Sequence, residues 1–201
     1  MDAGVVGLVA GAGWAAGVNL YAVVALLGIY GRMGLGEVPD ALVRTDTITI
    51  AAVLFAFEFV ADKVPFIDSL WDLGHTVLRP LGATVLGLVL TGEAETWQQA
   101  TAAMSSGGLA TASHVAKATA RLAINTSPEP ASNVVVSLGE DGLVAAVVWF
   151  AVTNPLLAVV LVLVLLAGGT VLTIALIGAA RRGLRAWRER RREAARRRSW
   201  P

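Results

Sequence analysis

Long apolar segments separated by short polar breaks dominate the hydrophobic pattern of the chain. Residues 156–180 form an uninterrupted uncharged run, which at ~1.5 Å rise per residue spans a hydrocarbon core of roughly 30 Å. Glycine, proline and charged residues end the other apolar segments. The pattern predicts an all-α membrane protein with about six transmembrane helices, at residues 5–30, 46–61, 66–90, 96–124, 140–153 and 156–180.

The composition supports a membrane protein and narrows its chemistry. Of the 201 residues, 56% are hydrophobic and 15% are charged, whereas an ordinary soluble domain has about 25% charged residues. The chain has no cysteine, which excludes disulfides and thiolate metal sites. It also lacks the nucleophile-elbow, P-loop and zinc-protease motifs. We therefore expect neither an enzyme nor a bound cofactor or metal.

Basic residues are concentrated at the C-terminus. Ten of the sixteen Lys and Arg residues lie within residues 181–198, although the formal net charge of the chain is only +1. Basic residues favour the cytoplasmic side of a membrane and attract anionic lipid headgroups. The pattern predicts one transmembrane domain at residues 1–180 and a basic cytoplasmic tail at residues 181–201, with lipid headgroups rather than nucleic acid as its partner. Six spans then place the N-terminus in the cytoplasm as well.

A shift of 94 residues aligns two parts of the chain, so that "AAVLFAF" at residues 51–57 matches "AAVVWFA" at residues 145–151. The implied halves, about 5–92 and about 96–180, would each contain three spans and would have opposite orientations. Inverted repeats occur in many transporters, where the substrate site lies between the halves. Ordinary duplication in a structural membrane protein is the alternative.

The segment "DKVPFIDSLWDLGHTVLRP", residues 62–80, places six ionisable side chains in an otherwise apolar chain. At ~100° per residue, the polar side chains of the third and fourth predicted helices each form one narrow stripe. A charge at the centre of a membrane helix costs about 2.5–3.5 kcal/mol, so the stripes should face each other or water. The candidate site residues are Glu58, Asp62, Lys63, Asp68, Asp72, His75, Arg79, His114, Lys117, Arg121 and Asn125.

The two stripes have complementary charge, because the third helix is mainly acidic and the fourth is mainly basic. The favoured pairs are Asp72 with Arg121 and Asp68 with Lys117. Asn19, in the first predicted helix, is expected to make an interhelical hydrogen bond rather than to contact a ligand.

Three interpretations of the stripes remain open. They could line the path of a ligand or ion, form ion pairs that only fix helix packing, or lie on an interfacial helix in the headgroup layer. We favour a transporter or channel-like protein for a small polar or anionic solute. Transport could be coupled to protons, because two histidines and an excess of acids suit proton transfer. In this hypothesis Arg79, Lys117 and Arg121 hold the anionic group, while His75 or His114 and the carboxylates carry the proton.

Two further features concern partners. The basic fourth helix could instead grip a lipid phosphate headgroup, as in a flippase, which requires a groove open sideways to lipid. Gly7 and Gly11 lie four residues apart in the first helix, a spacing that allows close helix–helix approach and favours a homodimer.

Three segments carry a resemblance to a known family. They are "GWAAGVNLYAV" near the start, "FEFVADKVPFIDSLWDLGHTVLRP" in the middle and "ASHVAKATARLAINTSPEPASN" after it. On these motifs the chain resembles the family of small bacterial integral membrane proteins called domain-of-unknown-function family 4126, over roughly residues 10–178. The resemblance implies the cytoplasmic (inner) membrane of a bacterium. It implies no activity, so the functional argument depends on the charged residues.

Overall fold

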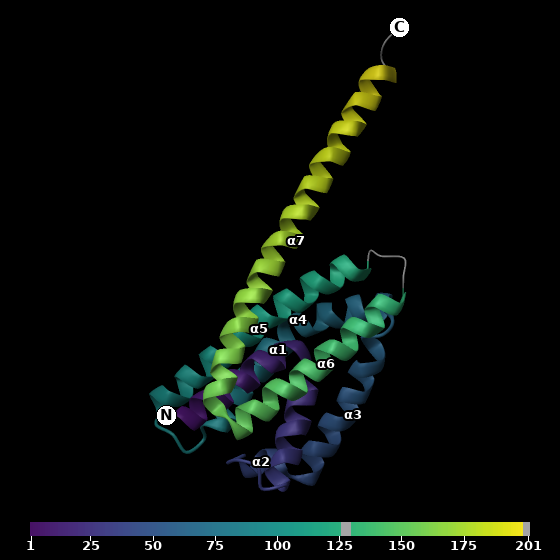
Figure 1. Ribbon diagram of the computed structural model, residues 1–201. Helices are drawn as coiled ribbons and strands as arrows, with labels where there is room; N and C mark the ends of the chain where they lie inside the picture. Colours follow the sequence, from purple (N-terminus) through teal and green to yellow (C-terminus); the bar gives the residue numbers. More distant parts are fainter. Residues whose placement is uncertain (126–129, 199–201) are drawn as a thin grey trace.

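The computed structural model describes residues 1–125 and 130–198, and within these ranges every regular element is a helix (Figure 1). The helices are α1 (Ala3–Arg32), α2 (Asp40–Val43), α3 (Thr45–Ala61), α4 (Pro65–Leu90), α5 (Thr96–Asn125), α6 (Pro130–Thr153) and α7 (Pro155–Arg198). The predicted all-α class is confirmed, and a long helix covers each of the six predicted segments. The short helix α2 lies in the predicted loop between the first two predicted helices.

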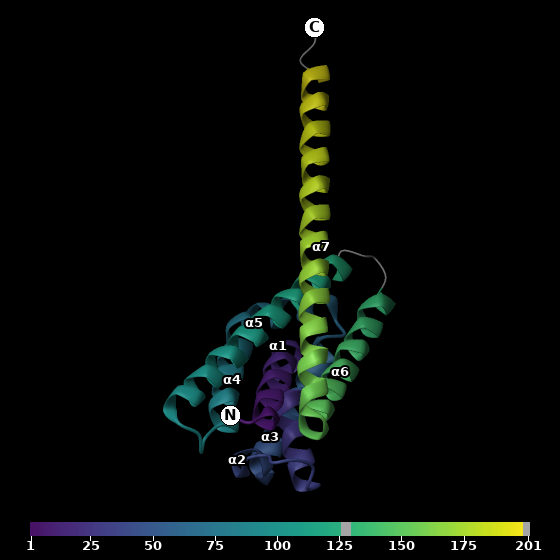
Figure 2. The same ribbon diagram turned by 60° about the vertical axis from the view of Figure 1, so that its left-hand side comes forward.

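The largest departure from the predicted topology lies in α1. Asn19 has non-helical φ and ψ angles of −152° and 97°, so α1 consists of two helical halves, residues 3–18 and 20–32. Figures 1 and 2 show that the second half turns back toward the end of the bundle from which the first half starts. The predicted first span is therefore a broken helical hairpin with Asn19 at its tip.

Contacts along α6 confirm that the two halves of α1 run in opposite directions. Gly7, near the N-terminus, lies against the first residue of α7, just beyond the end of α6. Asn19 reaches Asp141, near the middle of α6. The ring of Tyr30 then contacts the ring of Trp149, close to the end of α6, with 5.5 Å between the ring centroids. Both ends of α1 thus lie at the same end of the bundle.

Each of the other long helices runs from one end of the bundle to the other (Figure 1). The start of α1, the loops before α2 and after α4, and the α6–α7 junction line one cavity, and we call this end the vestibule end. The α3–α4 junction and the Arg-rich part of α7 lie at the opposite end, the tail end. Because α1 turns back and α3 to α7 cross, the two termini lie at opposite ends. This arrangement gives no support for the predicted placement of both termini in the cytoplasm.

The outer surface of the bundle is apolar, as expected for a protein that faces lipid. Four helical segments have the length and hydropathy to cross a membrane, namely Ala3–Arg32, Leu70–Leu90, Ser132–Thr153 and Pro155–Arg191. In the most apolar stretch of the α7 segment, only 6% of the residues are buried. Large exposed Leu, Val, Ile and Phe side chains also cover outward faces of α3, α4 and α6. Such extensive apolar exposure is rare in soluble monomers, and the four segments indicate a multi-pass membrane protein.

Two predicted helix boundaries are wrong. The sequence pattern starts the fifth helix at residue 140, but α6 begins at Pro130, where the fixed φ angle and missing N–H of proline suit the first helical position. Glu140 consequently lies in the middle of a helix. The pattern ends the sixth helix at residue 180, whereas α7 continues through the basic segment to Arg198.

The structure gives no support for the predicted inverted repeat. The shift of 94 residues matches α1 to α5, yet α1 is broken at Asn19 and α5 is a continuous helix that crosses the bundle. The two halves therefore follow different paths through the molecule.

Small residues allow α1 to approach its neighbours closely. A side chain at Gly7 would meet the backbone of Pro155, and one at Gly11 would meet Ala151. The two glycines that suggested a dimer thus serve packing within the chain, and the homodimer stays a prediction.

We expect Gly17→Ala to destabilise the protein, because the added methyl group would collide with Ser113 and the backbone of Ala110 on α5. Overpacking of this kind costs about 1–3 kcal/mol. Gly108→Ala is the matched control, since nothing lies within 4 Å of a Cβ there. Thermal unfolding in detergent should show a lowered midpoint for Gly17→Ala only; equal midpoints for the two variants would contradict the close approach of α1 and α5.

Candidate functional site

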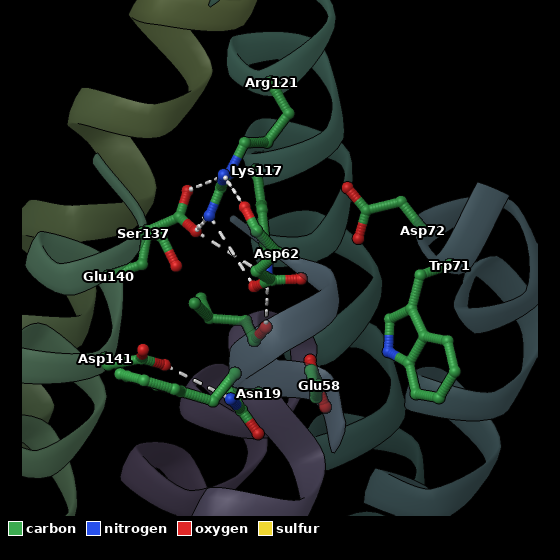
Figure 3. Close-up of polar contacts among 12 residues, drawn as sticks. Asn19, Glu58, Asp62, Trp71, Asp72, Lys117, Arg121, Ser137, Glu140 and Asp141 are labelled. Carbon is green, nitrogen blue, oxygen red and sulfur yellow. Dashed lines mark hydrogen bonds and ion pairs between the residues drawn. The ribbon is translucent and has the colours of Figure 1, made fainter. Parts of the chain in front are cut away.

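A network of buried charged and polar side chains lies among α1, α3, α4, α5 and α6 (Figure 3). Eight of the predicted site residues belong to it, and each is at most 6% exposed: Glu58, Asp62, Asp72, His75, Arg79, His114, Lys117 and Arg121. The six described members of the two predicted stripes, Asp72, His75, Arg79, His114, Lys117 and Arg121, are buried, in agreement with stripes that face other helices. This burial does not support an interfacial position of the α4 stripe.

Arg79, on α4, is the centre of one half of the network. Its Nη2 donates to Glu58 Oε1 at 2.6 Å, and its Nη1 lies 3.0 Å from Asp72 Oδ1 and 2.8 Å from His114 Nδ1. The side chains of Arg79 and Glu58 are fully buried. One guanidinium therefore joins α3, α4 and α5, and it lies between two carboxylates.

The hydrogen bonds of both histidines fit neutral rings. Arg79 can only donate, so His114 Nδ1 is the acceptor of their hydrogen bond and carries no proton. His75 Nδ1 lies 2.8 Å from the carbonyl of Trp71, which can only accept, so this nitrogen carries the proton. The other ring nitrogen of His75 lies 3.2 Å from the Tyr21 hydroxyl, which can donate or accept. His114 Nδ1 therefore carries no proton, and the contacts of His75 are compatible with a neutral ring.

Lys117 and Arg121, one turn apart on α5, form the other half of the network. Lys117 Nζ lies 2.7 Å from Asp62 Oδ2, and Arg121 Nη2 lies 2.6 Å from Glu140 Oε2. Arg121 Nη1 also donates to Asn133 Oδ1 at 2.7 Å and to the carbonyl of Asp62 at 3.0 Å. Since Asp62 is the C-cap of α3, Arg121 joins the end of that helix to α6.

The break in α1 brings backbone carbonyls into the same network. The last turn of the first helical half leaves carbonyl groups without intrahelical partners. The carbonyl of Gly17 lies 3.5 Å from Arg79 Nη1, and that of Val18 accepts from Lys117 Nζ at 3.1 Å. Cations at the C-terminal end of a helix are favourable because the helix dipole is negative there. The tip of the hairpin is thus held by one cation from α4 and one from α5.

Asn19 connects the two halves of α1 and contacts α6. Its Oδ1 accepts from the N–H of Ala22 at 2.9 Å, which caps the second helical half. Its Nδ2 donates to Asp141 Oδ1 at 3.2 Å. The predicted interhelical hydrogen bond of Asn19 is confirmed, and the same side chain also stabilises the break.

Three members of the network were missed by the sequence analysis: Asn133, Glu140 and Asp141. The error follows from the late predicted start of the fifth helix, which left these residues in a loop or at a helix end. The signal that could have found them is Pro130 before a mixed run rich in valine, since proline is favoured at the first position of a helix.

Three predicted site residues are not among these eight. Lys63, at the α3–α4 junction, is half-buried and donates to the Phe59 carbonyl at 2.8 Å, with its ammonium over the Phe59 ring. Partial burial lowers the pKa of the Lys63 ammonium group. The side chains of Asp68 and Asn125 lie outside the described part of the structure. The predicted Asp68–Lys117 ion pair therefore stays a prediction.

The predicted pairing of Asp72 with Arg121 is wrong. Asp72 accepts from Arg79, seven residues along the same helix, while Arg121 contacts Asp62 and Glu140. Helical periodicity shows which face a side chain is on, but it does not show which neighbouring helix lies opposite.

The cavity at the vestibule end, which we call the vestibule, shares no lining residue with the network, whereas a smaller crevice includes two of its members. The vestibule has a volume of about 900 Å³, and its lining includes the acidic residues Asp2, Glu37, Asp40 and Glu93 and, within the described chain, no Lys or Arg. The smaller crevice, of about 210 Å³, lies between α1, α5, α6 and α7. Its walls are mainly apolar or small side chains, with Lys117 and Glu140 as its charged members.

A metal site receives no support from the described residues, among which no three His, Asp or Glu side chains form a group that could hold an ion.

The geometry defines a helical multi-pass membrane protein with a buried salt-bridge network around a broken helix. Residues 6–176 match the family model described as domain of unknown function DUF4126, and the chain belongs to that family. No curated protein and no solved structure matches it.

Proposed function

We propose that the protein is a membrane transporter or channel-like protein for a small polar or anionic solute, with transport coupled to protons. The observation that carries this proposal is the broken α1 hairpin, whose tip contacts the middle of α6 and lies among buried charges. Irregular backbone inside a membrane is tolerated only where it is buried in protein or lines an aqueous cavity. In many transporters the ends of broken helices form the substrate and ion sites.

The buried charges support a path rather than packing alone. Each charge inside a membrane helix costs about 2.5–3.5 kcal/mol on insertion scales, and such residues commonly mark substrate or proton pathways. Arg79 and Lys117 each contact both a carboxylate and a backbone carbonyl at the break in α1. Any change in these ion pairs would therefore act directly on the tip of the hairpin.

The pairing suggests how a proton and an anion could be coupled. In this state Arg79 forms ion pairs with Glu58 and Asp72, and Lys117 forms an ion pair with Asp62. A proton taken up by one of these carboxylates neutralises it and releases a cation from its ion pair. The released cation can then hold the anionic group of a solute, so proton and solute would move together.

A panel of ligands tests this proposal with purified protein. Phosphate, carboxylates and nucleotides are added at neutral and mildly acidic pH, and the unfolding temperature is recorded for wild type, Arg121→Ala and Asp72→Asn. We expect one anion class to stabilise wild type, more strongly at acidic pH, and not to stabilise Arg121→Ala. Arg44→Ala is the matched control because Arg44 forms an exposed ion pair with Asp46. Absence of any response in wild type, or equal responses in all variants, would contradict the proposed site.

A lipid-phosphate flippase is the second candidate, and the small crevice is the observation that favours it. Its apolar walls beside Lys117 suit an acyl or isoprenoid chain with a polar head. Polyprenyl phosphate in the same panel separates the two: stabilisation by the lipid but not by inorganic phosphate would favour the flippase.

We further propose that the vestibule faces the outside of a bacterial cytoplasmic membrane and that the Arg-rich tail lies in the cytoplasm, near anionic headgroups. Because the chain has no cysteine, single cysteines can report on sidedness. In intact cells an impermeant maleimide is expected to label Glu93→Cys and Ala3→Cys, and to label Arg188→Cys only after permeabilisation. If Ala3→Cys behaved like Arg188→Cys, α1 would cross the membrane after all.

A further inference from the structure

The charged network has more carboxylates than cations. Among the described residues its fully buried charges balance, with Glu58, Asp62 and Asp72 against Arg79, Lys117 and Arg121. The half-buried Glu140 and Asp141 add two negative charges at its edge, so with neutral histidines the network carries a formal charge of −2. Lys63 adds one positive charge at its edge, where its ammonium contacts Phe59 and Ser137. One negative charge remains without a counterpart even then.

Two carboxylate oxygens at the end of α3 accept no hydrogen bond from the described residues. Glu58 Oε2 and Asp62 Oδ1 are buried and have no partner among them, and their side chains are 0% and 3% exposed. Asp141 Oδ2 shares this property, but its side chain is only half-buried. Asp62 is the C-cap of α3, and its N–H donates to the Glu58 carbonyl at 2.9 Å. The helical turn thus includes Asp62 and places the two side chains as neighbours on the same face. A buried charged acceptor without a donor is strongly disfavoured, so this pair lacks something that donates.

The groups around the pair restrict what that donor can be. They are Tyr21 on α1, Asp72, His75 and Arg79 on α4, His114, Lys117 and Arg121 on α5, and Glu140 and Asp141 on α6. The three cations already contact carboxylates. His114 Nδ1 accepts from Arg79, and the contacts of His75 are compatible with a neutral ring. The unpartnered carboxylate oxygens therefore favour a carboxyl group as the place of a surplus proton.

We infer that Glu58 and Asp62 share one proton at neutral pH, with a hydroxyl on one carboxyl group donating to the unpartnered oxygen of the other. The pair neutralises the surplus charge and satisfies both free oxygens. Shared protons of this kind arise where two carboxylates lie too close for both to ionise. That this proton is the one coupled to solute movement rests on the proposed function, whereas its presence on the pair does not.

Infrared spectroscopy of the full-length protein in lipid tests the inference directly. A protonated carboxyl group has a C=O stretch that is separate from the carboxylate bands. We expect this band in wild type at neutral pH, and we expect Glu58→Gln to remove it while Asp72→Asn retains it. Wild type without the band, or a band that persists in both Glu58→Gln and Asp62→Asn, overturns the inference.

Isotope labelling keeps the test valid if the α3 variants fail to fold. Wild type carrying ¹³C in the side-chain carboxyl of glutamate, and separately of aspartate, should shift the band in at least one sample. A band that shifts with neither label does not come from a carboxylic acid and overturns the inference.

These outcomes are separate from those of the transport proposal. The infrared band depends on the resting protein alone and requires no solute. A protonated pair in a protein that responds to no ligand would support the inference and contradict the transporter. An anion response without a protonated pair would do the reverse.

Discussion

Replacing Arg79 with methionine is expected to lower the free energy of unfolding by about 3–5 kcal/mol, the usual cost of removing one partner from a buried ion pair. The side chain is fully buried, and it contacts Glu58 at 2.6 Å and Asp72 at 3.0 Å. Its loss leaves both carboxylates without their cation. Denaturant titration in mixed micelles measures the change.

The double variant Glu58→Leu/Arg79→Met separates a structural role from a functional one. Because replacing a whole buried pair with apolar residues can be nearly neutral, most of the lost stability should return, apart from the part caused by the isolated Asp72. Recovered stability with a lost ligand response supports a functional site. Recovered stability with an unchanged ligand response would leave Arg79 only a packing role.

An exposed ion pair serves as the control for this series. The side chains of Arg44 and Asp46 are 66% and 56% exposed, although their atoms are 2.6 Å apart. Exposed pairs contribute little because water screens them. Arg44→Met should therefore unfold at the wild-type temperature, and a loss comparable to that of Arg79→Met would show that burial does not decide the effect.

Replacing Asn19 with alanine should both destabilise the hairpin and abolish solute binding. Loss of the helix cap costs about 1 kcal/mol. The half-buried Asp141 left without its donor adds less than the about 1–3 kcal/mol of a fully buried group. Since the hairpin tip presents its carbonyls to Arg79 and Lys117, its displacement should also disturb both ion pairs. The thermal-shift panel and denaturant titration measure the two effects.

Asn154→Ala is the matched control for this change. Asn154 is exposed between α6 and α7 and contacts the neighbouring Thr153 side chain. It should keep wild-type stability and ligand response. An Asn19→Ala protein with wild-type stability and ligand response would show that the break in α1 does not depend on Asn19 and that the tip takes no part in binding.

The helices could be predicted well because their signals are local. Glycine, proline and charged residues interrupt apolar runs, and the predicted bounds of the third helix, 66–90, differ from α4 by one residue. The inward direction of the polar stripes was also predictable, since charges four and seven positions apart share one helical face. Eight predicted site residues are buried together for this reason.

The missed parts of the site depend on how helices meet. Glu140 and Asp141 look like the end of a span because charged residues usually mark one, and only the contacts with Arg121 and Asn19 make them interior residues. The ion-pair partner of Asp72 likewise depends on which helix lies opposite. It also depends on the length of the Arg79 side chain, which contacts Asp72 within the same helix, α4.

The sequence by itself determined the membrane class, the positions of the helices and the face on which each charge lies, because all three depend on composition and short-range periodicity. Only the tertiary structure decided that α1 turns back. Residues 3–32 form one long apolar segment, and a single asparagine within it is compatible with a continuous helix. The break is stable because Asp141, Arg79 and Lys117, contributed by three other helices, satisfy the polar groups that it exposes.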